Sequence, residues 1–132
     1  MDWKLELVPV PVADVDRAKR FYNEQVGFVV DHDTRVSDTM RFVQLTPPGS
    51  ACSIVLGASS NPPGSVQGLQ IVVSDIEAAQ AELAERGVDV SKVLHFEGGA
   101  QVEGRGGEWN SFVFFSDPDG NSWTLQERPA SN

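Results

Sequence analysis

The chain has 132 residues, of which 40% are hydrophobic, and its 19 acidic and 10 basic side chains give a formal net charge of −9. This length and composition suffice for one domain with a buried core, and no stretch reaches the roughly 18 apolar residues of a membrane-spanning helix. The negative charge argues against nucleic acid or an anionic membrane as a partner.

The first half of the chain predicts a strand, a helix and two more strands. Its opening segment MDWKLELV has none of the features of a signal peptide, and LELVPVPV alternates apolar residues as a half-buried strand does. A helix is expected at Val15–Val26, with Asp14 as its N-cap and Gly27 as its end. The two strands are MRFVQLT and CSIVLG, joined by the turn PPGSA.

Residues 58–66 are rich in proline, glycine and serine and predict a linker, after which the pattern of elements restarts. GLQIVVSD predicts a strand, and the next segment predicts a helix at Ile76–Arg86. Either Ser74 or Asp75 caps the start of this helix, and Gly87 ends it.

The C-terminal part predicts a short strand in SKVLHF, a glycine-rich loop at residues 97–108, and two strands, WNSFVFF and SWTLQE. The acidic stretch SDPDGNSW joins these last two strands. It does not match a calcium-binding loop, because counting from Asp117 places the glycine at position 4 and Arg128 at position 12. Its proline, glycine and Asp or Asn residues instead favour a hairpin turn.

The same order of elements occurs twice. VADVDRA at Val12–Ala18 and VSDIEAA at Val73–Ala79 are similar, and RFVQLTPPGS is similar to SFVFFSDPDGNS. The chain therefore predicts two βαβββ modules, at about residues 1–60 and 66–132, within a single domain at 1–132. Because the helix of each module covers only one face of its sheet, we expect an α+β fold with curled mixed sheets around a cavity.

Three segments, VPVADVDRAKRFYNEQVGF, VVSDIEAAQAELAERGV and FFSDPDGNSWTLQE, resemble the vicinal oxygen chelate superfamily. This superfamily includes glyoxalases, extradiol dioxygenases and bleomycin-resistance proteins. The resemblance covers nearly the whole chain and implies the paired βαβββ fold, commonly assembled as a homodimer. Unpaired sheet edges and apolar rim residues also favour a homodimer.

The resemblance further implies where a metal would bind in metal-using members, whose four ligands are His or Glu side chains. The matching positions here are Leu7, Val55, Gly68 and Thr124. These residues lack the imidazole and carboxylate groups that zinc, iron or manganese sites require, and shifting the register by one residue does not restore the set. We therefore expect no metal and no cofactor.

Strand alternation assigns the side chains to two faces of each expected sheet. The face expected to pack against the helices carries Val8, Val10, Val12, Val43, Leu45, Ile54, Leu56, Leu69, Ile71, Val73, Val113, Phe115, Trp123 and Leu125. The expected ligand-binding residues are on the other face and at its rim: Trp3, Leu7, Phe42, Gln44, Val55, Gln70, Trp109, Phe112, Phe114 and Thr124. Pro9, Ser53 and Gln126 share that face.

Such a lining suits a flat or apolar small molecule that the amide groups orient, although the aromatic side chains could instead fill the cavity themselves. Other chemical groups are sparse. The single cysteine, Cys52, excludes an internal disulfide and favours a reducing, cytoplasmic location. We expect His32 to be a solvated histidine in a loop, Arg105 to be solvated, and the 97–108 loop to be a mobile flap over the cavity. His95, near the expected cavity mouth, is a weak candidate for a base, and no catalytic residue is assigned.

Two functions remain open. The first is a metal-free small-molecule-binding protein of the bleomycin-resistance type, which sequesters an apolar or aromatic compound, cationic ones included. The alternative is a glyoxalase-like lyase, isomerase or dioxygenase that uses relocated metal ligands or a metal-free acid or base, either His95 or a carboxylate.

Overall fold

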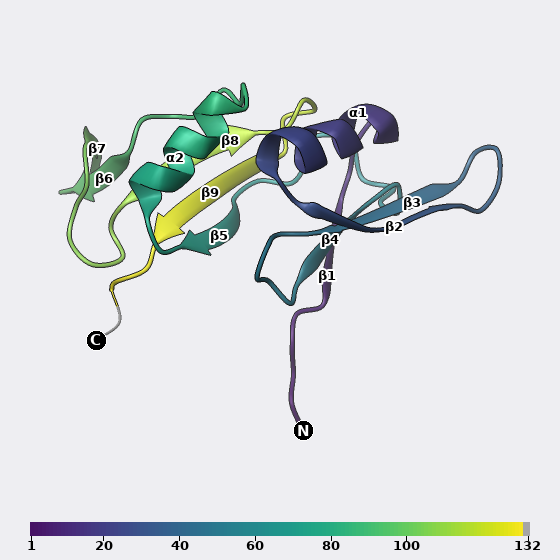
Figure 1. Cartoon of the computed structure of the whole chain (residues 1–132), viewed down its shortest axis with the longest axis horizontal. Coiled ribbons are helices and arrows are strands. Elements are labelled where there is room, and N and C mark those ends of the chain that lie inside the picture. The colour runs from purple at the N-terminus through teal and green to yellow at the C-terminus, as the bar shows by residue number, and fades with distance from the viewer. Residues whose placement is uncertain (131–132) are drawn as a thin grey trace. The chain divides into compact units, whose positions relative to one another are not determined.

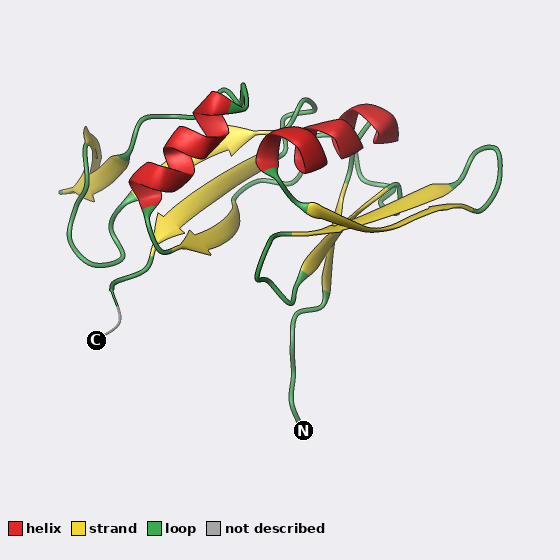
Figure 2. Cartoon of the chain, viewed as in Figure 1, coloured by secondary structure: helices red, strands yellow, loops and turns green. Residues whose placement is uncertain are grey.

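The computed structural model of the chain describes residues 1–130 and divides into two compact units (Figure 1). The first unit comprises Met1–Val66 and Asp117–Asn121, and the second comprises Gln67–Ser116 and the residues from Ser122 onward. Each unit contains one mixed β-sheet and one helical segment (Figure 2). None of the helices in the described part of the chain is long and apolar enough to cross a membrane.

The first unit is a four-stranded sheet in the order β1-β4-β3-β2. Strands β1 and β4 are parallel, and the other neighbours are antiparallel. The elements in chain order are β1 (Leu7–Val10), α1 (Val15–Arg20), η1 (Phe21–Val26), β2 (Val29–Arg35), β3 (Arg41–Thr46) and β4 (Ser53–Leu56).

The helical segment of the first unit begins and ends where the sequence predicts. The Asp14 carboxylate accepts a hydrogen bond of 3.1 Å from the Arg17 amide, so it satisfies one of the unpaired N–H groups of the first turn. Gly27 ends the segment in the left-handed conformation, with φ of 94°, which glycine adopts at little cost. The α-helical turns of α1 continue into the wider π-helical turns of η1.

The second unit is a five-stranded sheet in the order β5-β9-β8-β6-β7, with β5 and β9 parallel. Asp75 rather than Ser74 caps its helix, because the Asp75 carboxylate accepts a 3.0 Å hydrogen bond from the Ala78 amide. The elements are β5 (Leu69–Val73), α2 (Ile76–Glu85), β6 (Leu94–Glu97), β7 (Ala100–Glu103), β8 (Phe112–Ser116) and β9 (Ser122–Glu127).

Two strands lie where the sequence pattern did not predict them. Strand β2 contains the polar segment DHDTR, and β7 lies inside the expected loop at 97–108, where Gly98 and Gly99 turn the chain with φ of 55° and 83°. Both are edge strands whose side chains are mostly exposed, so neither shows the alternation of apolar residues that marks a half-buried strand. His32, expected in a loop, therefore belongs to a strand.

The predicted alternation of faces is confirmed in β3, β8 and β9. Val43 and Leu45 in β3 are fully buried, whereas Phe42 and Gln44 between them are half-buried. Arg41, on the same face as Val43, forms an ion pair with Asp16 of the α1 helix. The helical segment therefore covers the Val43 face, and the Phe42 and Gln44 face is the open one. In the second sheet Val113, Phe115, Trp123 and Leu125 are likewise buried.

Candidate ligand-binding site

The open side of the second sheet carries three phenylalanines and three neutral polar side chains, which we call the aromatic face: Phe96, Phe112, Phe114, Gln70, Thr124 and Gln126. Strand register places Gln70, Thr124 and Phe114 in one row and Gln126 opposite Phe112 in the next. The rings of Phe112 and Phe114 are nearly parallel, with centroids 6.3 Å apart. The Phe96 ring meets that of Phe112 edge-on at 5.4 Å.

No ionisable side chain interrupts this side of β5, β9 and β8. Residues of the same parity in those strands are Gln70, Val72, Phe112, Phe114, Ser116, Ser122, Thr124 and Gln126. Their side chains are half-buried or exposed, and Phe96 is 40% exposed. The face therefore offers aromatic surface together with a few neutral groups that can form hydrogen bonds.

An amide chain gives these polar groups a fixed direction. The Gln126 Nε2 donates to the Trp109 carbonyl oxygen at 2.7 Å. Because that oxygen can only accept, the Gln126 amide must present Nε2 to it, and its Oε1 then accepts from Gln70 Nε2. Gln70 consequently has its own Oε1 left as an acceptor. Trp109 itself lies in the left-handed region, with φ of 61°, which is uncommon for a residue other than glycine, and its side chain is 52% exposed.

The open side of the first sheet carries the other predicted lining residues. Register places Pro9, Val55, Gln44 and His32 in one row across β1, β4, β3 and β2. Phe42 is two residues from Gln44 on the same side of β3, as strand alternation requires. This face is more polar than the aromatic face and includes a histidine that sequence reasoning placed in a loop.

Within each unit, the structure brings most of the predicted ligand-binding residues together. Those on the second sheet or beside it are Gln70, Trp109, Phe112, Phe114 and Thr124, and those on the first are Leu7, Phe42, Gln44 and Val55. Trp3 is 88% exposed in the segment before β1. Sequence reasoning missed Phe96, because its strand was too short and irregular to assign a parity.

His95 does not lie on the aromatic face. Leu94 pairs with Phe112, so Leu94 and Phe96 share the side of Phe112 and His95 points to the other side. There its Nδ1 is 2.8 Å from the Gly104 carbonyl oxygen, and its Nε2 is 3.4 Å from Glu97. The imidazole is buried. It is therefore placed to hold the chain around Gly104 rather than to act on a ligand bound at Phe112.

Arg105 is held by carboxylates of its own unit. It pairs with Glu127 and, at 3.7 Å, with Glu77, and the hydrogen bond that it donates to Glu127 raises the pKa of the guanidinium. The second oxygen of Glu127 accepts from the Ile76 amide at 2.9 Å, at the start of α2. The glycine-rich segment is thus tied to the helix and to β9 through one side chain.

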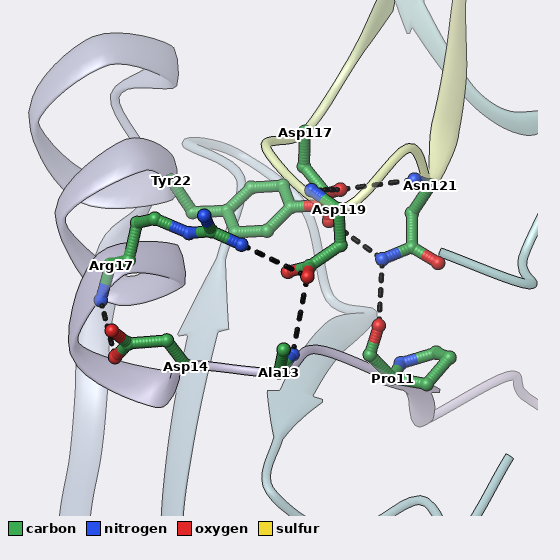
Figure 3. A network of polar contacts seen from close by, with 8 residues as sticks. All are labelled: Pro11, Ala13, Asp14, Arg17, Tyr22, Asp117, Asp119 and Asn121. Carbon is green, nitrogen blue, oxygen red and sulfur yellow. Dashed lines mark hydrogen bonds and ion pairs between the residues drawn. The ribbon is translucent and has the colours of Figure 1, made fainter. Parts of the chain in front are cut away.

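The acidic turn between β8 and β9 is an internal polar network of the first unit (Figure 3). Asp117 is buried and accepts from the Tyr22 hydroxyl at 2.7 Å, from the Asn121 side chain at 2.7 Å, and from the backbone amides of Asp119 and Asn121. Asn121 also donates to the Pro11 carbonyl oxygen at 2.8 Å. All the Asp117 lone pairs are used, which agrees with a structural turn and leaves no acceptor for a ligand.

The residues at the positions that the resemblance assigns to metal ligands do not fit a metal ion. Leu7, Val55 and Gly68 have no side-chain donor atom, and Thr124 has a single hydroxyl oxygen. Within residues 1–130, no three His, Cys, Asp or Glu side chains form a group that could hold a metal ion elsewhere. Imidazole and carboxylate ligands are what such sites use, so this donor set supports no metal-assisted step.

Comparisons with known proteins agree with this architecture. Residues 4–125 match the family model of the Glyoxalase/Bleomycin resistance protein/Dioxygenase superfamily. TnmS3, an antibiotic binding protein from Streptomyces sp. CB03234, is 35% identical and superposes with a TM-score of 0.77 over 97% of this chain and 98% of its own.

A glyoxalase/bleomycin resistance protein from the same Streptomyces strain is 36% identical, with a TM-score of 0.74 over 93% of this chain and 99% of that chain. The uncharacterized protein YetH of Bacillus subtilis (strain 168) is 30% identical over 123 residues, which are 91% of this chain and 94% of YetH.

Proposed function

The chain belongs to the Glyoxalase/Bleomycin resistance protein/Dioxygenase superfamily, and from that premise we propose that it is a metal-free small-molecule-binding protein of the bleomycin-resistance type. It sequesters an apolar or aromatic compound, cationic ones included, and releases it unchanged. The observation that carries this proposal is the aromatic face, where Phe112 and Phe114 present nearly parallel rings beside oriented amides.

The composition of the aromatic face suits a planar ligand. Each aromatic contact adds about 0.5–1.5 kcal/mol beyond the burial of apolar area. Three such contacts and the desolvation of the ring reach a dissociation constant of about 1 μM, near −8 kcal/mol, after the cost of association. Gln70 and Gln126 then fix the orientation of the ligand, because the Trp109 carbonyl oxygen sets the direction of their hydrogen bonds.

The residues at the metal positions and the orientation of His95 favour sequestration over catalysis. A lyase or dioxygenase of this superfamily would need metal ligands at positions that here hold Leu7, Val55, Gly68 and Thr124. A metal-free isomerase would need a base beside the ligand. His95 points to the opposite side of the sheet, and this side of β5, β9 and β8 carries no carboxylate. The description of TnmS3 as an antibiotic binding protein, at 35% identity over nearly the full chain, supports the same class of function.

We also propose that the protein is a homodimer. Strand β1 is an edge of its sheet, and Trp3, Leu5 and Leu7 alternate along the segment that leads into it with exposed fractions of 88%, 73% and 38%. An exposed apolar strand edge is a surface that a second copy would cover.

The test is a titration of the purified, chelator-treated protein with planar aromatic compounds, cationic antibiotics among them, followed by tryptophan fluorescence. We expect saturable binding that Phe114→Ala weakens by about tenfold, since it removes one ring contact and the apolar area of that ring. Val36→Ala, which removes an exposed apolar side chain elsewhere, serves as the matched control. The proposal fails if no compound binds, if binding needs a metal ion, or if the compound is recovered chemically altered.

A further inference from the structure

A β-bulge brings a carboxylate to the open side of the first sheet. In the pairing of β2 with β3, Val30 lies opposite Leu45 and His32 opposite Gln44, so Asp31 is the extra residue between them. The Asp31 carboxylate accepts a hydrogen bond from the Thr46 hydroxyl. Thr46 has the same parity as Gln44, and therefore this contact lies on the open side rather than on the side that α1 covers.

The hydrogen bonds of this group have only one consistent order. Thr46 has a single hydroxyl proton, and an ionised carboxylate can only accept, so that proton is directed to Asp31. Ser53 Oγ lies 2.6 Å from Thr46 Oγ1, and since the Thr46 proton is already used, Ser53 must be the donor in this pair. The hydroxyl protons of Thr46 and Ser53 are therefore both used in hydrogen bonds within this group. Towards a ligand, the three side chains can only accept hydrogen bonds.

Asp31 also differs from the neighbouring carboxylate. Asp33 receives hydrogen bonds from Arg41 and Lys19 on the helix-covered side of the sheet. Asp31 forms no ion pair with any residue between 1 and 130, and its side chain is accessible, whereas Ser53 is buried next to Leu7 in register. The Asp31 carboxylate is thus a hydrogen-bond acceptor without a cationic partner, and it is linked through Thr46 and Ser53 to the apolar start of β1 at Leu7.

We propose that Asp31, Thr46 and Ser53 form a binding subsite within the first unit for the hydrogen-bond-donating end of a small molecule, and that a protonated amine or amidine fits it best. This inference rests on the proposed function and names the class of compound. The ammonium group would donate to Asp31 and Ser53, and its apolar remainder would lie along Leu7, which is 38% exposed on the same face. The net charge of −9 would attract such a compound from a distance, and the subsite would recognise it on contact.

Three matched probes test this chemistry: naphthylmethylamine, naphthylmethanol and ethylnaphthalene, used as one positional isomer throughout and titrated into the full-length protein. They share a ring and a size, and they present a charged donor, a neutral donor and no donor. We expect the amine to bind about tenfold more tightly than ethylnaphthalene, with the alcohol between them, because hydrogen bonds to charged groups are the stronger ones.

Asp31→Asn should remove most of the advantage of the amine and leave the affinity for ethylnaphthalene unchanged. Asp38→Asn is the matched control, because Asp38 is exposed in the turn after β2 and its loss changes the net charge equally. If both variants lower the affinity for the amine to the same extent, the preference for the amine comes from the net charge of the protein and not from the subsite, and the inference is wrong. If ethylnaphthalene binds and the amine has no advantage, the subsite alone fails. If none of the probes binds, the proposed function fails with it.

Thr46→Val tests the order of the protons. Without the Thr46 hydroxyl, the Ser53 hydroxyl can donate to a ligand. The methyl ether of naphthylmethanol can only accept hydrogen bonds, so its affinity should approach that of naphthylmethanol in this variant. If the alcohol binds more tightly than the ether by the same factor in the variant and in the wild-type protein, the hydrogen bonds do not run from Ser53 to Thr46 to Asp31 as we infer. Ser53→Ala removes only the hydroxyl group of this β4 residue. It should lower the affinity for naphthylmethanol and leave the affinity for ethylnaphthalene unchanged.

Discussion

Removing the Tyr22 hydroxyl tests how firmly the acidic turn is held. In Tyr22→Phe the ring keeps its stack with Phe28, whose centroid lies 5.7 Å away, and only the O–H group that donates to Asp117 at 2.7 Å is lost. Both partners are buried, so water does not replace the missing donor. The change removes a hydrogen bond between elements that lie far apart in the sequence.

The magnitude follows from the charge and burial of the acceptor. A hydrogen bond to a charged group contributes about 1.5–3 kcal/mol to the free energy of unfolding. For a chain of this size each kcal/mol lowers the melting temperature by about 3–5 °C, so we expect a decrease of roughly 5–15 °C. Asp117 retains its other three donors, and the fold should survive.

Urea unfolding and calorimetry measure this effect, and Tyr22→Leu is the companion variant because it removes the ring as well. The midpoint of Tyr22→Phe should fall with an unchanged denaturant slope, and Tyr22→Leu should cost about 2 kcal/mol more for the lost ring packing. A Tyr22→Phe protein within about 0.5 kcal/mol of wild type would refute the account of the turn as a buried charged network.

Three further outcomes follow from other parts of the structure. Gly64→Ala should destabilise the protein by about 2 kcal/mol or more, measured by urea unfolding, because a Cβ would lie 2.1 Å from the Asp119 carbonyl oxygen and φ is 81°; an unchanged midpoint would contradict that packing. The Arg41 guanidinium and then Lys19 hold the pKa of Asp33 well below its usual range, so this pairing stabilises the fold above about pH 4 and is lost as the pH falls through the folded-state pKa. The stability difference between wild type and Arg41→Met should therefore be largest near neutral pH and shrink in acid, and a pH-independent difference would count against it. Light scattering should give twice the 14.3 kDa monomer mass, and a monomer at micromolar concentration would exclude the proposed dimer.

Most of the fold could be predicted from local patterns in the sequence. Asp14 and Asp75 mark the starts of both helices, and the alternation of Val43 with Gln44 or of Val113 with Phe114 gives the two faces of a strand. These signals act over a few residues, and the repeat of the same order along the chain then predicted two similar sheets.

The elements that the sequence missed depend on contacts rather than on patterns. Strand β2 is stabilised by pairing with β3, and its polar side chains resemble those of a loop. The position of Asp31 depends on a bulge, which has no signature in a single sequence, so the carboxylate on the open face could not be anticipated. Likewise, Tyr22 and Asp117 are 95 residues apart, and no local rule joins them.

A crystal structure of the chelator-treated protein, soaked with the tightest aromatic ligand from the fluorescence titration, would show how the aromatic face binds this compound. We expect an unmodified compound whose ring lies against Phe112 and Phe114, with a polar group at Gln70 Oε1 and no anomalous signal from a metal ion. A metal ion coordinating the compound, a compound converted to product, or an aromatic face filled by the protein's own side chains would contradict this expectation.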